Sequence, residues 1–517
     1  RFARRADATV IQLNNDLTAS YQKDINDNIQ STTSLGGTIQ YLKLNSFGGT
    51  AQQLGAFGST IDNGIINASE SRSQLSILGG FLQQTFGLFN RLYLTGAVRV
   101  DASSVYGEEN RTQVYKKFSG SYIISNEKFW GDNLKKVISS LKLRAAYGES
   151  GNLTAIGAFD RLTNYDPAIY NGQAGYLSPT RLGNFNVKPE RQNEIEVGFD
   201  MNLLNERISV EFSYFKKDVS DLILNRTLAP TTGFVNRLVN IGTMNNKGFE
   251  FLVRAVPVDH KDFRWVTSLS YLTNDNVVDG VEGNGVLPFA GGFSQVAAVN
   301  GGPLGAFYST FFARNTDGSL LLDAAGFPQR ERGVQLANGK YNIQRSAAGQ
   351  PTGAILSKII GNPLPEHVIS FINEFEYKKL SFRMQWDAMQ NVDVFNFTKR
   401  VGDRDLYGGL AGYEDELNGV VPKGTSTALF SIFENWIEDG SFVKLREVSV
   451  SYQLNPRFLK RNSLRLTLSG RNLLSIDDYS GWDPETNAAG QDNAVRGFDF
   501  VEVPLPRIIM FGLNFNF

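Results

Sequence analysis

The segment PRIIMFGLNFNF, residues Pro506–Phe517, carries apolar side chains at every second position over most of its length. The alternating apolar positions are Ile509, Phe511, Leu513, Phe515 and Phe517, and Gly512, Asn514 and Asn516 lie between them. A period of two places the apolar side chains on one face of a β-strand and the polar ones on the other. Such a strand fits the half-covered sheet of a soluble sandwich and also the wall of a membrane barrel, whose apolar face meets lipid. This segment alone leaves both architectures open.

The same alternation recurs along the chain, for example in 194–203, where apolar residues alternate with carboxylates. We expect strands at about 74–86, 91–101, 114–125, 137–148, 191–203, 206–220, 244–257, 262–277, 366–377, 379–393, 440–453, 463–475 and 506–517, with weaker ones near 9–21 and 36–46. Val443 and Leu445 are out of phase with the later apolar residues of their strand. This break predicts a β-bulge or a strand buried on both faces.

The lengths of the predicted connections distinguish the two architectures. Short ones at 87–90, 204–205, 258–261, 378 and 455–462 mostly alternate with long ones at 149–190, 221–243, 277–365, 394–439 and 476–505. A transmembrane barrel has short periplasmic turns and long extracellular loops, so its short and long connections alternate. Nothing in the architecture of a soluble sandwich requires this alternation. The sequence therefore predicts an all-β, transmembrane antiparallel β-barrel. The run Phe307–Phe312 would break this alternation of short and long connections if it crossed the membrane, so we place it inside a long loop.

The alternation also predicts which side chains face lipid. We expect Phe199, Phe212, Trp386 and Leu513 to face lipid and Glu196, Glu211 and Asn514 to face the lumen. About fifteen strands are visible, and single-chain bacterial barrels close with an even number, so we expect the missing strands upstream. Arg1 is not preceded by a signal peptide, which fits the same expectation.

Composition excludes several classes of function. The 51 basic residues nearly balance the 52 acidic ones, so nucleic acid is not an expected partner. No apolar run approaches the roughly 18 residues of a membrane-spanning helix. There is no cysteine, and the only histidines are His260 and His367. We find no nucleophile elbow, phosphate loop or metal-ligand cluster, and so we expect neither an enzyme nor a cofactor or metal.

Several motifs are similar to the C-terminal part of the SusC/RagA family of TonB-dependent outer-membrane transporters of Bacteroidota. The stretches are LKLRAAYGESGN at 141–152, TTGF at 231–234, NIGTMNNKGFEF at 240–251, GPLGAFY at 302–308, IIGNPLP at 359–365, WIEDGSFVKLREVSVSY at 436–452, SGRNLLSIDDYSGWDPETN at 469–487, and RGFDF and PLPR within 496–507. They follow the family's order from about residue 74 onward, whereas residues 1–70 match weakly.

The resemblance implies a 22-stranded barrel with an N-terminal plug domain. Residues 1–517 would then be the C-terminal portion of the barrel, without the plug. It also implies active import of oligosaccharides or oligopeptides, energised by the TonB–ExbB–ExbD complex through the missing N-terminal part. A SusD-like surface lipoprotein would cover the extracellular face, and the barrel would lie in the outer membrane, in contact with its lipid. A passive porin-like channel and a scaffold in a surface assembly remain alternatives.

Aromatic residues of the predicted extracellular loops are the candidate cargo-binding residues, because flat rings with a polar edge stack on sugars and side chains. They are Tyr165, Tyr170, Tyr176, Tyr407, Tyr413, Tyr479 and Trp482. The alternative is that they pack the loops or the partner lipoprotein. Trp436 and Tyr452 flank a predicted strand, so we expect them in an aromatic belt at the membrane interface. The predicted lumen charges, Glu194, Glu196, Asp200, Glu211, Arg254, Arg383, Arg465 and Arg471, either guide cargo or pair with one another and with the plug.

Overall fold

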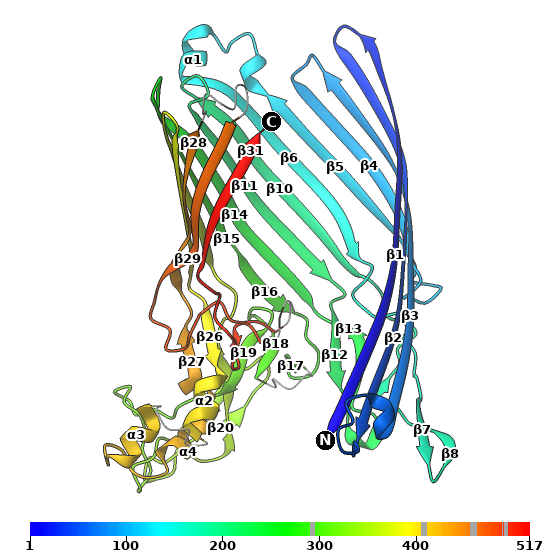
Figure 1. The fold of residues 1–517 in the computed structure, drawn as a ribbon, viewed down its shortest axis with the longest axis vertical. Coiled ribbons are helices and arrows are strands. Elements are labelled where there is room, and N and C mark those ends of the chain that lie inside the picture. The colour runs from blue at the N-terminus through cyan, green and yellow to red at the C-terminus, as the bar shows by residue number, and fades with distance from the viewer. Residues whose placement is uncertain (290–294, 405–410, 455–462, 489, 491–494, 517) are drawn as a thin grey trace. The chain divides into compact units, whose positions relative to one another are not determined.

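The computed structural model describes residues 1–289, 295–404, 411–454, 463–488, 490 and 495–516. The chain divides into two compact units: unit 1 comprises 1–122, 145–195 and 219–241, and unit 2 comprises 123–144, 196–218 and 242–517. Most of the regular structure is β-strand, and sixteen strands belong to one sheet that follows the chain order (Figure 1). The predicted all-β antiparallel architecture is therefore confirmed. Within the described residues, no helix is both long and apolar enough to cross a membrane.

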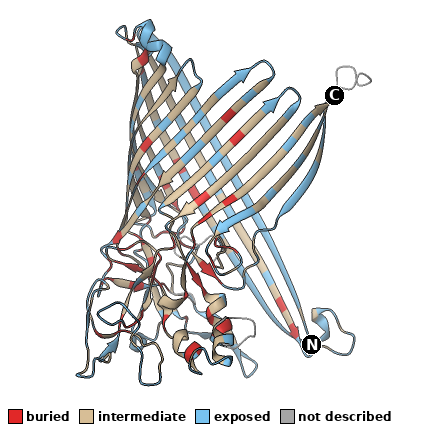
Figure 2. Cartoon of the chain, turned by 90° about the vertical axis from the view of Figure 1, so that its left-hand side faces the viewer, coloured by how far each residue is buried: buried red, intermediate tan, exposed pale blue. Residues whose placement is uncertain are grey.

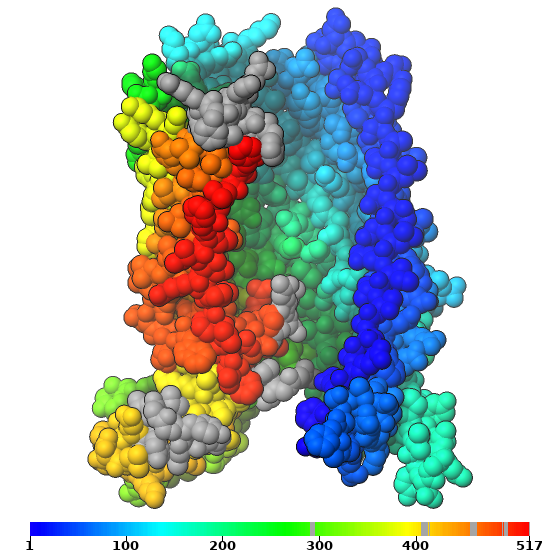
Figure 3. Space-filling view, in the orientation of Figure 1, coloured from blue at the N-terminus to red at the C-terminus, as the bar shows by residue number. Residues whose placement is uncertain are grey.

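The sheet of unit 1 begins with long strands. They are β1 (Phe2–Asn26), β2 (Ile29–Gln52), β3 (Ile65–Leu88), β4 (Leu92–Ser103) and β5 (Thr112–Ile123), each antiparallel to the next. β3 pairs with β2 over its whole length but with β4 only from Ile77 onward. β1, drawn in dark blue in Figure 3, is exposed along almost all of its length. These first three strands are much longer than the sequence pattern predicted.

The remaining elements of unit 1 lie in its long connections. They are η1 (Ile61–Asn63), the hairpin of β7 (Asp166–Tyr170) and β8 (Gln173–Leu177), β9 (Arg181–Leu182), β12 (Ile223–Thr227), η3 (Pro230–Thr232) and β13 (Asn236–Asn240). The buried cluster of this unit is formed by Val105, Tyr106, Ile156, Val187 and Leu238, all of them from or beside these connections. The core of unit 1 therefore lies in its loops.

Besides β5, whose last residue lies in unit 2, three strands are divided between the units. They are β6 (Ile138–Asn152), β10 (Glu190–Leu203) and β11 (Ile208–Ser220), with η2 (Ile124–Asn126) and α1 (Asp132–Val137) before β6. In unit 2 the rings of Phe199, Phe212 and Phe249 stack, with centroids 5.6 Å and 5.9 Å apart. Phe199 and Phe212 thus share one face, as the alternation predicted.

The strand wall of unit 2 consists of eight strands. They are β14 (Thr243–His260), β15 (Phe263–Thr273), β16 (Asp275–Asp279), β24 (His367–Tyr377), β25 (Leu380–Gln390), β28 (Phe442–Leu454), β29 (Ser463–Asp477) and β31 (Ile508–Asn516). Their register aligns apolar residues across six strands in the row Trp265, Phe375, Phe382, Val450, Leu468 and Phe511. The next row is Arg264, Glu376, Ser381, Ser451, Thr467 and Gly512, on the opposite face. The wall has one apolar and one polar face, with Trp386 and Leu513 on the apolar one.

Two irregularities shape this wall. The strand predicted at 262–277 is interrupted at Asn274, but β15 and β16 pair with β14 in one continuous antiparallel register, with Leu272 opposite Glu250 and Asp275 opposite Lys247. Gly248 lies opposite this interruption, where a Cβ would be 1.9 Å from the carbonyl oxygen of Thr273. The second irregularity is the predicted bulge in β28. Gln385 pairs with Glu447 and Trp386 with Leu445, so Arg446 is the extra residue.

The long connections of unit 2 contain small sheets and short helices. The sheets are β17 (Val286–Pro288), β18 (Val296–Val299), β19 (Ala306–Thr310) and β23 (Ser357–Gly361); β20 (Arg332–Gln335), β21 (Tyr341–Ile343) and β22 (Ala354–Ile355); and β26 (Asp393–Asn396), β27 (Ile437–Asp439) and β30 (Phe498–Asp499). The helices are α2 (Phe397–Arg404), α3 (Ala411–Leu417), α4 (Thr425–Phe430) and η4 (Phe433–Trp436). Phe307–Phe312 lies here, inside a long connection, as predicted.

Burial is distributed differently in the strands and in the loops of unit 2. The largest fully buried side chains include Trp436, Phe307, Phe395 and Phe498, all of them in long connections. In the wall, by contrast, Phe511 is 69% exposed and Leu513 is 64% exposed. Figure 2 shows the long strands mostly in tan and pale blue, the colours of intermediate and exposed residues. An extended row of exposed apolar side chains on a regular sheet marks a surface that contacts a membrane or another protein.

Candidate functional site

The described residues of three long connections of unit 2, within 280–366, 391–441 and 478–507, pack together and are called the loop body here. Phe307, Phe395 and Phe498 come from the three different connections and meet edge to face, with ring centroids 4.7–6.3 Å apart. Phe397 and Phe433 extend this cluster. Edge-to-face contacts add about 0.5–1.5 kcal/mol per pair to the burial of the rings. The cluster makes the three loops one packed body.

Polar contacts join the same connections. Tyr479 donates a hydrogen bond from Oη to Oδ2 of Asp499 at 2.7 Å, and Thr398 donates one to Oδ1 at 2.9 Å. Burial, followed by the hydrogen bond to Asp499, raises the pKa of Tyr479 above its ordinary value. Burial alone would raise the pKa of Glu438, but hydrogen bonds from Ser480 and Lys399 lower it below the ordinary value. Glu438 therefore stays ionised and ties the second connection to the third.

Helix α2 inserts a buried cation between aromatic rings. The guanidinium carbon of Arg400 lies 3.5 Å from the ring centroid of Phe430 and 4.2 Å from that of Phe433. Its Nε donates to the carbonyl of Phe430 at 3.1 Å. Burial lowers the pKa of Arg400 to about 10, so the side chain remains charged at neutral pH. Stacking on two rings is the arrangement that a planar guanidinium favours in a desolvated place.

The bulge in β28 gathers charges on the polar face of the wall. A bulge turns neighbouring residues toward the same side. Arg446 Nε is accordingly 3.1 Å from Asp387 Oδ2, and the next residue, Glu447, is 3.1 Å from Arg383. β29 carries a matching irregularity at Asn472, whose φ is 52°. The predicted lumen charges Arg383 and Arg471 both pair with Glu447, so pairing among neighbours holds for these two.

Two carboxylates of the third connection bind to this charged face. Lys444 Nζ is 2.5 Å from Asp483 Oδ1 and 2.8 Å from Glu485 Oε2, and Arg446 is 2.5 Å from Glu485 Oε1. The side chains of Lys444 and Asp483 are only 6% and 9% exposed. Burial raises the pKa of Asp483, but the Lys444 ammonium and two backbone N–H groups outweigh this and lower it. These ion pairs attach the loop body to the wall.

A second charge cluster lies on β6, β10 and β11 within unit 2. Arg144 bonds to Glu196, to Asp200 at 3.1 Å and to Ser213 at 2.5 Å. Lys142 is 2.5 Å from Asp200. The two predicted lumen carboxylates Glu196 and Asp200 are thus held by cations of a neighbouring strand. Pairing with one another is the arrangement that the structure favours for these charges.

The predicted cargo-binding aromatics lie in different surroundings. In unit 1, Tyr165, Tyr170 and Tyr176 are 62%, 86% and 77% exposed, and all three lie in or beside the β7–β8 hairpin. The register places Tyr170 and Tyr176 on opposite faces of that hairpin. In unit 2, Trp482 is 74% exposed, whereas Tyr479 is 7% exposed and packs inside the loop body. Tyr413 lies in α3, and Tyr407 lies outside the described residues.

One interpretation from the sequence was wrong. Trp436 does not lie in a membrane-interface belt, because it is 1% exposed and its Nε1 donates to the carbonyl of Leu429 inside the loop body. Tyr452, by contrast, is 44% exposed on β28 and pairs with Leu380 and Leu466. A tryptophan beside a strand end resembles a belt residue in the sequence. The helical turn η4, which ends at Trp436, places this side chain inside the loop body.

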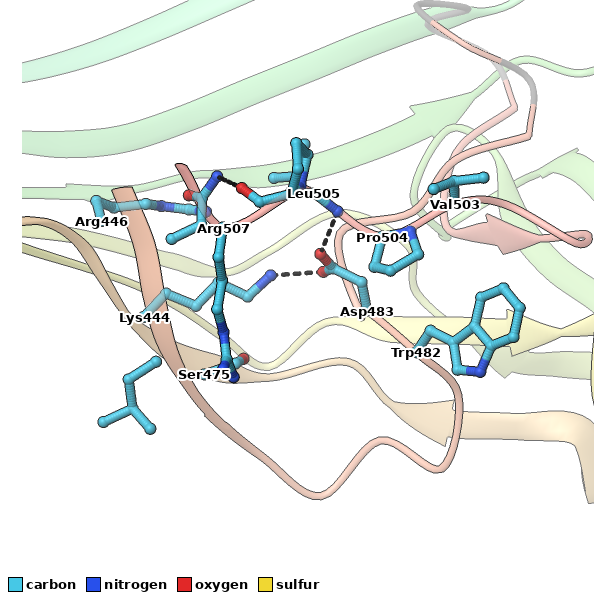
Figure 4. A pocket seen from close by; sticks show the side chains of 12 residues that line it. Lys444, Arg446, Ser475, Trp482, Asp483, Val503, Pro504, Leu505 and Arg507 are labelled. Atoms are coloured by element: carbon cyan, nitrogen blue, oxygen red, sulfur yellow. Dashed lines mark hydrogen bonds and ion pairs between the residues drawn. The ribbon is translucent and has the colours of Figure 1, made fainter. Parts of the chain in front are cut away.

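A pocket of about 510 Å³ lies where the loop body meets β28 and β29. It is called the Trp482 pocket here, and its lining residues are Lys444, Arg446, Asn472, Leu474, Ser475, Trp482, Asp483, Val503, Pro504, Leu505, Pro506 and Arg507. Figure 4 shows the three cations on one side of the view and Trp482, Val503 and Pro504 on the other. An aromatic face opposite cations can bind a ligand by stacking and ion pairing. Among the described residues, no cluster of three or more His, Cys, Asp or Glu side chains could hold a metal ion.

The alternating strands, the bare apolar face and the long loops agree with a comparison to known families. The family model described as TonB dependent receptor-like, beta-barrel matches residues 2–473. The chain belongs to this family. TonB-dependent receptor barrels are outer-membrane proteins, so the apolar face of the wall meets lipid and the polar face lines the lumen. The long connections are extracellular and the short turns are periplasmic.

Curated relatives carry the same family name. TonB-dependent receptor P26 of Formosa agariphila is 27% identical over 538 residues, which cover 98% of this chain and 53% of the relative. TonB-dependent receptor SusC of Bacteroides thetaiotaomicron is 24% identical over 469 residues, which cover 86% of this chain and 44% of the relative. The chain spans about half the length of the curated relatives it matches. The relatives are named as receptors, which supports a function other than catalysis.

A solved structure confirms the fold of this TonB-dependent receptor barrel. The RagAB peptide transporter superposes with a TM-score of 0.81 at 19% identity, over 99% of this chain and 56% of that chain. Together with the match to SusC, this confirms the resemblance to SusC and RagA that the motifs indicated. The family motifs at 302–308 and 359–365 overlap β19 and β23, which pair in the loop body.

Proposed function

We propose that the full-length protein actively imports nutrient oligomers, oligosaccharides or oligopeptides, across the outer membrane. TonB, with ExbB and ExbD, supplies the energy through the part of the polypeptide that lies outside residues 1–517. The observation that carries the proposal is the loop body, because a pore needs no packed extracellular domain. Binding surfaces concentrate on loops that a rigid scaffold positions. Membership of the TonB-dependent receptor family supports the energy source.

A SusD-like surface lipoprotein is the proposed partner above the loops. Its support is the likeness to SusC and the exposure of large side chains on the long connections. In the β7–β8 hairpin, Ile169 is 81% and Tyr170 is 86% exposed, and a two-stranded hairpin is marginally stable by itself. Exposed apolar residues on such an element fit a covering protein. Affinity purification under mild detergent is expected to recover a lipoprotein in near-equal amount.

Cargo binding is proposed for the exposed loop aromatics Tyr165, Tyr170, Tyr176 and Trp482. Tyr479 remains a candidate only if the loop body rearranges, because its ring and its hydroxyl are occupied in this structure. Flat rings accept both sugar faces and peptide side chains. The rings therefore agree with an oligomeric cargo without deciding between the two classes.

Uptake in the native bacterium tests the proposal against its alternatives. Cells that carry the complete gene are given labelled oligosaccharides or oligopeptides, with and without functional TonB. We expect accumulation that requires both the protein and TonB. Accumulation that persists without TonB would indicate a passive channel, and no dependence on the protein for any cargo would favour a scaffold.

A further inference from the structure

Three cations and one carboxylate line the Trp482 pocket, and most of this charge is paired. Lys444 and Arg446 each bind two carboxylates, so their charges are compensated. Asp483 is the only acid among the lining residues, and Lys444 and the N–H groups of Glu485 and Leu505 occupy its oxygens. Arg507 is exposed and makes no hydrogen bond or ion pair with another described residue. Its charge is therefore unpaired within the described residues.

Trp482 is exposed, although the chain on both sides of it is fixed. On one side, Ser480 donates its N–H to Glu438 at 2.9 Å. On the other side, Asp483 is bound by Lys444, and its carbonyl accepts the N–H of Thr486 at 3.2 Å. The indole N–H of Trp482 has no partner among the described residues. When a ligand binds to an exposed ring on an already ordered chain, little conformational entropy is lost.

The wall between Trp482 and Arg507 is apolar and rigid. It is formed by Val503, Pro504, Leu505 and Pro506, and Val503 is 81% exposed. The two prolines restrict the backbone of this segment. Asn472 donates to the carbonyl of Pro506 at 3.1 Å and fixes it to the bulge of β29. The pocket therefore combines a flat ring, an apolar floor and one free guanidinium in a preformed arrangement.

We propose that the Trp482 pocket binds an acidic sugar residue of an oligosaccharide cargo. Arg507 binds the carboxylate through charge-assisted hydrogen bonds, which a planar guanidinium forms in pairs. The indole covers the flat C–H face of the pyranose ring, and its free N–H donates to a hydroxyl. This inference rests on the proposed import function, because the pocket belongs to the loops that would meet the cargo.

The test uses the full-length protein purified in detergent together with any lipoprotein that accompanies it. The probes are oligogalacturonate and its neutral methyl ester, followed by an acidic peptide and the peptide with glutamine in place of glutamate. Calorimetry measures their affinities for the wild type, Arg507→Gln, Arg507→Lys, Trp482→Ala and the control Lys423→Gln, which changes an exposed loop cation outside the pocket.

We expect oligogalacturonate to bind about tenfold or more tightly than its methyl ester, as a charged hydrogen bond implies. Arg507→Gln should remove that preference, Arg507→Lys should keep part of it, and Lys423→Gln should leave it unchanged. Trp482→Ala should weaken both sugars alike. Equal binding of acid and ester, or an unchanged preference in Arg507→Gln, would overturn the proposal, and a preference confined to the acidic peptide would overturn the sugar assignment. TonB-dependent uptake by cells is measured separately, so a failure of the pocket and a failure of the import function are distinguishable.

Discussion

The strand wall and the loop body of unit 2 use apolar residues in opposite ways. On the wall, Leu468 and Phe511 are 55% and 69% exposed, while in the loop body Phe307 and Phe395 are at most 1% exposed. The wall obtains its apolar surroundings from lipid, so its strands need only one apolar face and complete hydrogen bonding. The loop body stands in water and must bury its own core. The same chain therefore stabilises its wall in lipid and its loop body in water by different means.

This difference separates what holds each region together. A change in the aromatic cluster removes packing from the loop body and leaves the lipid contacts of the wall untouched. A charge on the apolar face does the reverse, because its cost arises in the bilayer.

The largest expected effect is that of Phe395→Ala. Removing a fully buried phenylalanine costs about 3–5 kcal/mol, because it leaves a cavity among the rings of Phe307 and Phe498. We expect rapid proteolysis of the loop body while the barrel keeps its heat-resistant mobility on gels. Phe500→Ala is the matched control, since Phe500 is 44% exposed and its ring lies at the edge of the cluster, 5.0 Å from that of Phe397. Equal protease sensitivity of the two variants would contradict the packed cluster.

Leu468→Arg is expected to act on the wall. An arginine at the lipid-facing midplane costs about 2–4 kcal/mol, so the amount of heat-resistant barrel in membrane extracts should fall. Ser469→Arg, at the adjacent position on the polar face, should leave that amount unchanged. If both variants insert equally well, the assignment of the two faces is wrong.

Tyr479→Phe should have a smaller effect that is confined to the loop body. It removes the hydrogen bond to Asp499, a carboxylate that is 5% exposed, and leaving such a group without its donor costs about 1–3 kcal/mol. Hydrogen exchange in β26 and β30 should accelerate. Tyr165→Phe changes an exposed tyrosine and should alter nothing there. An unchanged exchange rate in Tyr479→Phe would show that this bond does not stabilise the loops.

The smallest effect is expected from acid. The pKa of Asp483 is lowered in the folded state, so its ion pair with Lys444 stabilises the protein above the ordinary value of 3.8 and is lost as the pH falls through the lowered value. Hydrogen exchange around Asp483 should therefore rise only at strongly acidic pH. In Lys444→Gln the exchange should already be raised at neutral pH and depend less on acid. The same acid response in both proteins would rule out the ion pair as its cause.

The sequence predicted the wall far better than the loop body, and the reason is physical. A strand between lipid and water must alternate, and so 463–475 and 379–393 were recognisable from their period alone. The phase break at Val443 and Leu445 was also visible, although it left a bulge and a strand buried on both faces open, and the register now places a bulge at Arg446. The loop body has no such period. Phe307, Phe395 and Phe498 come from connections far apart in the chain, and no local pattern indicates that they meet.

The candidate site could likewise be predicted only in part from the sequence. That large aromatics in the loops could bind cargo was predictable from residue type, and Trp482, Tyr170 and Tyr176 are indeed exposed. That Tyr479 is buried depends on Asp499, twenty residues away along the chain. The role of Arg507 was not predicted, because a free arginine is recognised only after the partners of Lys444 and Arg446 are known.

Cysteine labelling along β29 tests the central claim, that the wall separates lipid from water, most directly. The chain has no cysteine, so single cysteines at Leu466, Thr467, Leu468 and Ser469 report one position each. Cells that carry the complete protein are treated with a water-soluble maleimide. We predict that the cysteines at Thr467 and Ser469 react and that those at Leu466 and Leu468 are protected. Uniform labelling, or the reverse alternation, would contradict the account.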